Sequence, residues 1–141
     1  MKISYYKLLN NDHFLFFLKM TNNLTILLFI CLTICGCDHS ATIENKDAIQ
    51  LLNNEKYYFL DVRTLPEHKI QSIPNTPCIP VQEIGERLNE LENQKNKIIV
   101  VYCRSGNRSS KATKILNDNG FNAVNLIGGM NEWSGEVTRN N

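Results

Sequence analysis

The chain has few cysteines outside its N-terminal region. Of five cysteines in 141 residues, only Cys78 and Cys103 lie beyond position 37. Two cysteines so far apart form neither a disulfide framework nor the Cys-x-x-Cys pair of a zinc site. His39 and His68 have no neighbours in the sequence that would complete a set of metal ligands. We therefore expect no structural or catalytic metal and no cofactor.

A strong charge of either sign is also absent. The formal net charge is +1, so nothing in the composition argues for nucleic acid as a partner. Hydrophobic residues make up 43% of the chain, as in a globular protein, and the length suits one domain of ordinary size. We find no internal repeat and no low-complexity segment.

No apolar run is long enough to cross a bilayer. Residues 24–35 form an apolar run of twelve residues, whereas a membrane-spanning helix needs roughly 20. Lys2, Lys7 and Lys19 precede this run, an order that is typical of a signal peptide. Met20 is an alternative start of translation, although no lysine would then precede the run.

The apolar run ends in Ile-Cys-Gly-Cys at residues 34–37, which resembles the lipobox of bacterial lipoproteins. The resemblance implies cleavage after residue 36 and lipidation of Cys37, followed by a tether over residues 37–41. The protein would then be anchored to a membrane on the extracytoplasmic side, either in the periplasm or at the cell surface. An ordinary signal peptide and an uncleaved anchor remain the alternatives.

The rest of the chain alternates between strand and helix patterns, which predicts an α/β fold with a small parallel sheet and helices on both faces. The pattern predicts a loop over residues 63–77, where three prolines exclude regular structure, and a last helical turn over 130–133. The expected helices are residues 42–54, 81–93 and 107–119, and the expected strands are 57–62, 78–79, 98–102 and 123–127.

The segment after the most apolar strand is suited to holding a reactive thiolate. Cys103 follows this strand, and a helix pattern begins only four residues later. Helix N-termini carry partial positive charge and free N–H groups, which favour anionic sulfur. Arg104 and Arg108 add full charges, and Gly106 lets N–H groups converge. The alternative is a buried structural cysteine.

Cys103–Ser109, with the sequence CRSGNRS, resembles the active-site loop of the rhodanese-type sulfurtransferases, Cys-Arg-Ser-Gly-x-Arg-Ser. Three further blocks resemble the same family in order: Leu-Asp-Val-Arg at 60–63 with Glu67, Ile-Pro at 73–74 and 79–80, and Leu-Ile-Gly-Gly-Met at 126–130 with Trp133. The resemblance covers essentially residues 42–135, leaving a tail over 136–141. Two positions depart from it: Gln-Ser-Ile at 71–73 replaces the usual Gly-His-Ile, and Asn-Thr at 75–76 replaces Gly-Ala.

The resemblance implies a sulfurtransferase that works through a persulfide on Cys103. The thiolate would take a sulfane sulfur from a donor such as thiosulfate and pass it to cyanide or a thiol. The loop would stabilise the anionic sulfur in both states. Its expected members are Arg104, Ser105, Gly106, Asn107, Arg108 and Ser109.

Several roles within and around this loop stay open at the level of the sequence. Arg108 can attract an anionic donor or hold the loop, and Ser105 and Ser109 can donate hydrogen bonds or cap the helix. Cys78 can act as a resolving thiol, although packing is the better interpretation. For Asp61 and Arg63, which flank a strand end, we expect a structural salt bridge, and for Trp133 we expect a place in the core.

Two other functions remain as alternatives: a non-catalytic module of the same fold that binds a partner or senses oxidants, and a persulfide carrier for a protein partner. Phosphatase activity is disfavoured, because those enzymes use Cys-x5-Arg, and Cys103 and Arg108 form the shorter Cys-x4-Arg. We expect a monomer.

Overall fold

Four short parallel strands form the centre of the described part of the protein. The computed structural model describes residues 41–139. The sheet has the order β1-β4-β3-β2, and each neighbouring pair is parallel, which confirms the predicted fold class. The strands are β1 (Thr42–Ile43), β2 (Tyr57–Asp61), β3 (Ile98–Tyr102) and β4 (Asn122–Leu126).

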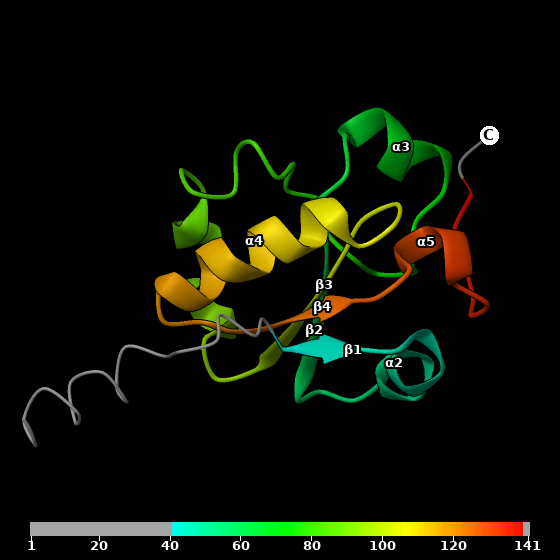
Figure 1. The fold of residues 1–141 in the computed structure, drawn as a ribbon, viewed down its shortest axis with the longest axis horizontal. Helices are drawn as coiled ribbons and strands as arrows, with labels where there is room; N and C mark the ends of the chain where they lie inside the picture. The colour runs from blue at the N-terminus through cyan, green and yellow to red at the C-terminus, as the bar shows by residue number, and fades with distance from the viewer. Residues whose placement is uncertain (1–40, 140–141) are drawn as a thin grey trace, which may run out of the picture. The chain divides into compact units, whose positions relative to one another are not determined.

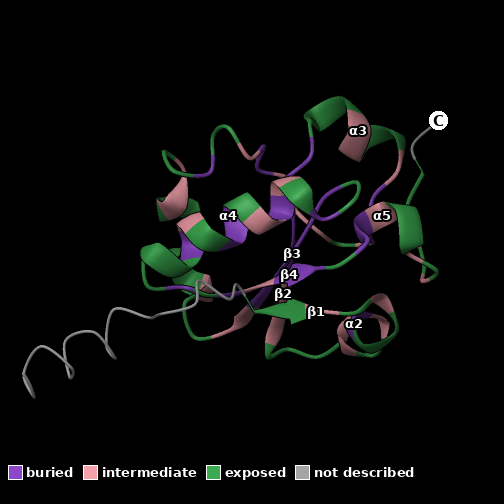
Figure 2. Ribbon diagram, viewed as in Figure 1, coloured by how far each residue is buried: buried purple, intermediate pink, exposed green. Residues whose placement is uncertain are grey.

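Helical segments cover both faces of the sheet (Figure 1). Residues of α4 (Asn107–Asp118) and of the 3-10 helix η1 (Leu88–Gln94) pack on one face. Residues of α2 (Asn45–Leu51) and α5 (Gly129–Glu132) lie on the other. Figure 2 shows that β3 and β4 are largely buried between helices whose outer sides are exposed, whereas the edge strand β1 is exposed. This is the two-sided burial that makes parallel strands apolar throughout.

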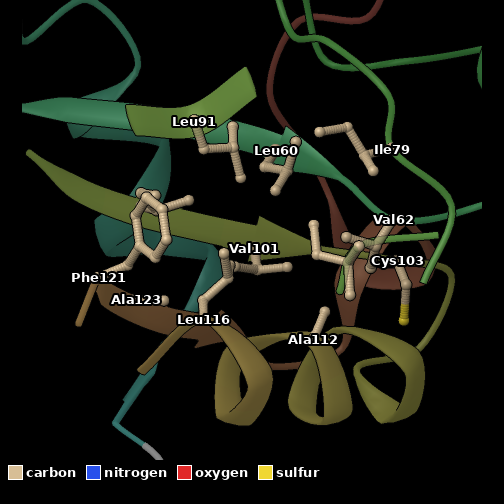
Figure 3. Packing of buried hydrophobic residues seen from close by; sticks show 12 residues of the cluster. Leu60, Val62, Ile79, Leu91, Val101, Cys103, Ala112, Leu116, Phe121 and Ala123 are labelled. Atoms are coloured by element: carbon tan, nitrogen blue, oxygen red, sulfur yellow. The ribbon is translucent and has the colours of Figure 1, made fainter. Parts of the chain in front are cut away.

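The alternation of side chains along β3 divides the core into two clusters. Ile99, Val101 and Cys103 face α4, whereas Val100 and Tyr102 face α2. Figure 3 shows Cys103 at one end of the α4-side cluster, which also contains Leu60, Ala112 and Leu116. The strand therefore carries the cysteine directly from the packed core to the edge where α4 begins.

The sequence predicted β3 at its observed bounds and α4 to within a residue, but four other segments differ. The segment at 42–54 begins with β1, and its helix starts only at Asn45. Residues 81–93 form turns followed by η1 instead of one α-helix, although Ile84 and Leu91 of the predicted stripe are buried. Residues 78–79 make only an isolated bridge, in which Cys78 pairs with Asp61.

The predicted loop at 63–77 was wrong, because α3 (Leu65–Ile70) lies within it. Pro66 is at the start of this helix, where its missing N–H costs nothing. Thr64 and Glu67 form a capping box: the Thr64 hydroxyl accepts from the Glu67 N–H, and the Glu67 carboxylate accepts from the Thr64 N–H. The proline that was taken to exclude a helix therefore begins one.

Within residues 41–139, no helix has the length and apolar character needed to cross a membrane. The predicted signal peptide, Cys37 and most of the tether lie outside the described residues.

Candidate active site

Cys103 lies directly after β3, and its sulfur faces the start of α4. The residue is 1% exposed. Its Sγ accepts a hydrogen bond from the Gly106 N–H at 3.2 Å and lies 3.4 Å from the Ser109 hydroxyl. The strand end and the helix start thus place a sulfur atom among donors, which is the arrangement expected from the sequence.

These contacts set the acidity of the thiol. Burial by itself would raise the pKa of Cys103. The Ser109 hydroxyl and the N–H groups of Ser109, Ser105 and Gly106 outweigh burial, because they interact best with a thiolate. The net result is a pKa below the ordinary value for cysteine, which favours the nucleophilic form.

Gly106 is the N-cap of α4 and has a φ of 99°, a left-handed conformation that only glycine adopts without strain. No side chain caps this helix, so the capping role considered for Ser105 and Ser109 does not apply. Asn107 is the first residue of the helix and is exposed. The loop therefore directs backbone N–H groups, rather than caps, toward the sulfur.

The start of α5 is hydrogen-bonded to the backbone of Cys103 and Arg104. The N–H of Met130 donates to the Cys103 carbonyl at 2.9 Å, and that of Asn131 donates to the Arg104 carbonyl at 3.0 Å. Gly129 permits this approach: a Cβ at this position would collide with the Cys103 carbonyl oxygen. These two hydrogen bonds tie the backbone of Cys103 and Arg104 to the start of α5.

Arg108 pairs with Glu67, which supports the interpretation that Arg108 holds the loop. Its guanidinium donates to both oxygens of Glu67, each at 2.8 Å. The Arg108 hydrogen bonds are the largest cause of a Glu67 pKa far below the usual range. The pKa of Arg108 rises mainly through Glu67, with a smaller contribution from the Cys103 thiolate. Arg108 thus holds the loop and also adds positive charge beside the sulfur.

Arg104 has no ion-pair partner within residues 41–139 and is exposed. It lines a shallow open cavity beside the loop, together with Arg63, Glu67, Ile70 and Met130. An anionic ligand entering this cavity would meet the Arg104 guanidinium. That Arg104 attracts a donor to Cys103 stays a prediction.

A second polar cluster lies at the end of β2. Asp61 is fully buried and accepts from the Arg63 Nε and Nη2 at 3.0 and 2.6 Å, so the expected salt bridge is present. His68 Nδ1 lies 2.9 Å from the same carboxylate, and with Cys78 Sγ these groups fall within 4.8 Å of one another. The expectation that His68 lacks neighbours able to bind a metal was therefore wrong. Arg63 already donates to both oxygens of the Asp61 carboxylate, which a metal at this place would need as a ligand.

Cys78 packs rather than reacts. Its Sγ donates to the Arg63 carbonyl at 3.4 Å. Burial, aided by the Asp61 charge, raises the pKa of its thiol to about 12, which keeps it protonated. This favours the packing interpretation over that of a resolving thiol.

The two departures from the family pattern fall in a segment that Tyr102 holds in place. The Tyr102 hydroxyl accepts from the Ile73 N–H at 3.2 Å and lies 2.7 Å from Thr76 Oγ1. Asn75 has a φ of 57°, so asparagine, which tolerates this conformation, stands where the family usually has glycine. Trp133 packs edge-on against Phe59 with ring centroids 6.3 Å apart, as expected for a core residue.

Two residues near the cysteine were not recognised as site residues from the sequence. Glu67 was noted only as part of a motif, although the capping box Thr-x-x-Glu signals its position. Asn125 was taken as an ordinary strand residue, yet its Oδ1 lies 2.6 Å from Ser109 Oγ. The available signal was a single amide side chain within the otherwise apolar run at 123–127.

Together, the fold and the loop define a class: a small α/β domain with a buried, acidified thiol at a strand–helix junction. The family model of the rhodanese-like domain matches residues 44–136. The chain belongs to this family.

Individual relatives agree with the assignment. The chain is 39% identical over 88 residues to the putative sulfurtransferase YtwF of Bacillus subtilis. This alignment covers 62% of this chain and 84% of the relative. It is 36% identical over 86 residues to the putative sulfur carrier protein YrkF of the same organism, covering 60% of this chain but only 45% of that protein. The crystal structure of a rhodanese-like domain protein from Staphylococcus aureus superposes with a TM-score of 0.64 at 34% identity, over 72% of this chain and 99% of that one. At the level of the family, these names support sulfur transfer.

Proposed function

We propose that the protein is a sulfurtransferase in which Cys103 carries the transferred sulfur as a persulfide. The observation that carries this proposal is the donor set around Sγ, namely the Gly106 N–H at 3.2 Å and the Ser109 hydroxyl at 3.4 Å, at the start of α4. A thiolate and a terminal persulfide sulfur are both anions, so the same donors stabilise both states.

In the first half-reaction, the thiolate attacks the outer sulfur of a donor such as thiosulfate. A sulfur–sulfur bond forms to Cys103, the sulfur–sulfur bond of the donor breaks, and its electron pair leaves with sulfite. Arg104 attracts the anionic donor, and Arg108 adds positive charge at the loop. In the second half-reaction, cyanide or a thiolate takes the outer sulfur and the Cys103 thiolate is restored. The kinetics are then ping-pong.

The experiment exposes the reduced full-length chain to thiosulfate and follows the Cys103 peptide by mass spectrometry. We expect the gain of one sulfur atom, which is lost again on adding cyanide. Cys103→Ser abolishes the gain, and Cys78→Ser, at the thiol that packs against Arg63, preserves it. A folded chain with a free Cys103 thiol that gains no sulfur from thiosulfate or from a small persulfide would instead support a binding or sensing module.

The acceptor separates two versions of this function. A sulfurtransferase passes the sulfur to small acceptors, whereas a persulfide carrier keeps it until a protein partner arrives. Rapid discharge of the loaded protein by cyanide and by small thiols supports the first. A persulfide that resists both, yet forms readily, would support the carrier.

We also propose that residues 1–36 are removed and that Cys37 is lipidated, which would place the domain on the extracytoplasmic side of a membrane. The Ile-Cys-Gly-Cys sequence at 34–37 supports this. Incorporation of a labelled fatty acid in a bacterial host, and its loss in Cys37→Ser, tests the proposal. Equal labelling of both chains would overturn it.

A further inference from the structure

The Ser109 hydroxyl has three neighbours that all act as hydrogen-bond acceptors. Its Oγ lies 3.4 Å from Cys103 Sγ, 3.1 Å from the Gly106 carbonyl oxygen and 2.6 Å from Asn125 Oδ1. A hydroxyl has a single hydrogen to donate. The shortest of the three contacts, to Asn125, therefore competes directly with the contact to the cysteine.

Asn125 occupies a position that would ordinarily hold an apolar side chain. It lies on β4 in register with Val101 of β3 and is only 8% exposed. Ala123, two residues earlier, belongs to the cluster under α4, and side chains two apart on a strand share a face. Burying an amide costs free energy unless it is hydrogen-bonded, and Ser109 supplies that bond.

A carboxamide offers an acceptor at one end and a donor at the other, and rotation of the group exchanges them. With Oδ1 toward Ser109, the hydroxyl donates to Asn125. With Nδ2 toward Ser109, the amide donates to the hydroxyl oxygen, and the hydroxyl hydrogen is free for the sulfur. The second arrangement forms a relay from Asn125 through Ser109 to Cys103.

We propose that Asn125 is a positioning residue whose amide orientation decides whether the Ser109 hydroxyl donates to the Cys103 sulfur. This inference rests on the proposed function, because it matters for a sulfur atom that becomes anionic. The orientation with Nδ2 toward Ser109 accompanies the thiolate and the persulfide, whereas the orientation with Oδ1 toward Ser109 suits the neutral thiol.

The other charged groups near this sulfur act independently of the relay. Arg108, paired with Glu67, faces Cys103 from α4, and Arg104 follows it in the loop. Asp61 and Arg63 of the β2 end are paired with each other. Within the described residues none of these side chains hydrogen-bonds to Asn125, so a change at Asn125 breaks neither of the two ion pairs.

The test measures the pKa of the Cys103 thiol without any sulfur donor. The rate of iodoacetamide alkylation of the full-length chain is followed against pH through the Cys103 peptide. Asn125→Asp keeps the size of the side chain but presents only acceptors, so it holds the Ser109 hydrogen. We expect the pKa of Cys103 to rise by about one unit or more, and Ser109→Ala to raise it by a similar amount.

The double variant separates the relay from a direct effect of charge. In the Ser109→Ala background, Asn125→Asp is expected to shift the pKa by less than half as much. Asn122→Asp adds the same charge at the exposed start of β4 and should leave the pKa unchanged. Equal shifts in both backgrounds, or no shift from Asn125→Asp in a folded chain, would overturn the proposal.

If Asn125→Asp does not fold, Asn125→Leu is used in its place. The relay predicts that Asn125→Leu changes the pKa of Cys103 in the parent but not in the Ser109→Ala background. A shift that persists there contradicts the relay. Since the alkylation needs no donor, this result stands apart from the sulfur-loading experiment: loading could fail while the relay is present, and the relay could be absent while loading proceeds.

Discussion

Arg108 and Glu67, 41 residues apart, form a bidentate ion pair in which both guanidinium–carboxylate contacts measure 2.8 Å. The same carboxylate caps α3 by accepting from the N–H and hydroxyl of Thr64. One side chain therefore fixes the start of α3 and the cation beside Cys103. Glu67 therefore links α3 to the loop, and we expect substitutions in α3 that displace Glu67 to shift Arg108 and change the charge beside the Cys103 sulfur.

Glu67→Ala is predicted to impair both stability and sulfur transfer. It removes a helix cap and an ion pair that is about a third exposed, so we expect a loss of about 1–2 kcal/mol in the free energy of unfolding. Arg108 would lose its anchor, and sulfur loading of Cys103 should slow. Denaturant unfolding and the loading rate measure the two effects.

The control for this variant is Glu90→Ala, which breaks a surface ion pair between Glu90 of η1 and Arg87, the residue just before η1. It should change stability by less than about 1 kcal/mol and leave loading unaffected. An equal loss of loading in both variants would show that general destabilisation, not the link from Glu67 to Arg108, is responsible.

Stability is predicted to fall at acidic pH through Glu67. Hydrogen bonds from Arg108 hold the pKa of this carboxyl well below its ordinary value of 4.5. A depressed pKa contributes stability above the unfolded-state value, and this contribution is lost progressively as the pH falls below about 4.5. Glu67→Gln should be less stable than the parent at neutral pH, and the difference should shrink with acidification. A difference that stays constant with pH would contradict this.

The sequence predicted the parts of the site that depend on local pattern. β3, the cysteine at its end and the glycine at the helix start follow from an apolar run, a polar loop and a helical period. The sequence did not predict which partner Arg108 selects, because that choice depends on α3 folding back over the loop. The prolines led us to miss α3, because Pro66 lies in the first turn of the helix, where an N–H has no intrahelical partner to lose.

The position of Asn125 was harder to predict for a different physical reason. In a strand of five residues, one polar side chain is compatible with either face, and the core-facing register became evident only once β4 paired with β3. The bend at Asn75 likewise depends on a left-handed φ that the sequence permits but does not require.

The buried pair of Asp61 and Arg63 is predicted to be essential to the fold. Asp61 is fully buried and Arg63 is 6% exposed, so removing the guanidinium leaves the buried carboxylate with only the backbone N–H of residue 63 and His68 Nδ1 beside it. Arg63→Met should cost about 3–5 kcal/mol, and Asp61→Asn with Arg63→Met should recover part of that loss. Urea unfolding of the parent, the two single variants and the double variant measures the coupling. A double variant as unstable as the sum of the singles would mean that the pair is not coupled.

Tyr102→Phe is predicted to loosen the segment that precedes Cys78. The hydroxyl lies in a buried site, where it accepts from the Ile73 N–H and contacts Thr76. Its loss leaves a buried N–H without that partner, which costs about 1–3 kcal/mol. The Cys103 sulfur does not touch this hydroxyl, so the rate of sulfur loading per folded molecule should stay near that of the parent. A large fall in loading would instead place Tyr102 in the chemistry.

Gly129→Ala is predicted to damage the site more than backbone strain alone can explain. Gly129 has a φ of 53°, and a Cβ there would meet the Cys103 carbonyl oxygen and the Arg104 backbone. Gly120 has a similar φ of 81° but an empty surrounding, so Gly120→Ala measures the strain by itself, about 1–2 kcal/mol. The loop must shift to admit the new methyl group in Gly129→Ala, and misplacement by about 1 Å can reduce a reaction rate roughly hundredfold. Sulfur loading should therefore fall sharply in Gly129→Ala and remain near the parent rate in Gly120→Ala. If both variants load equally well, the close approach of α5 does not position the cysteine, and the hydrogen bonds from Met130 and Asn131 serve stability only.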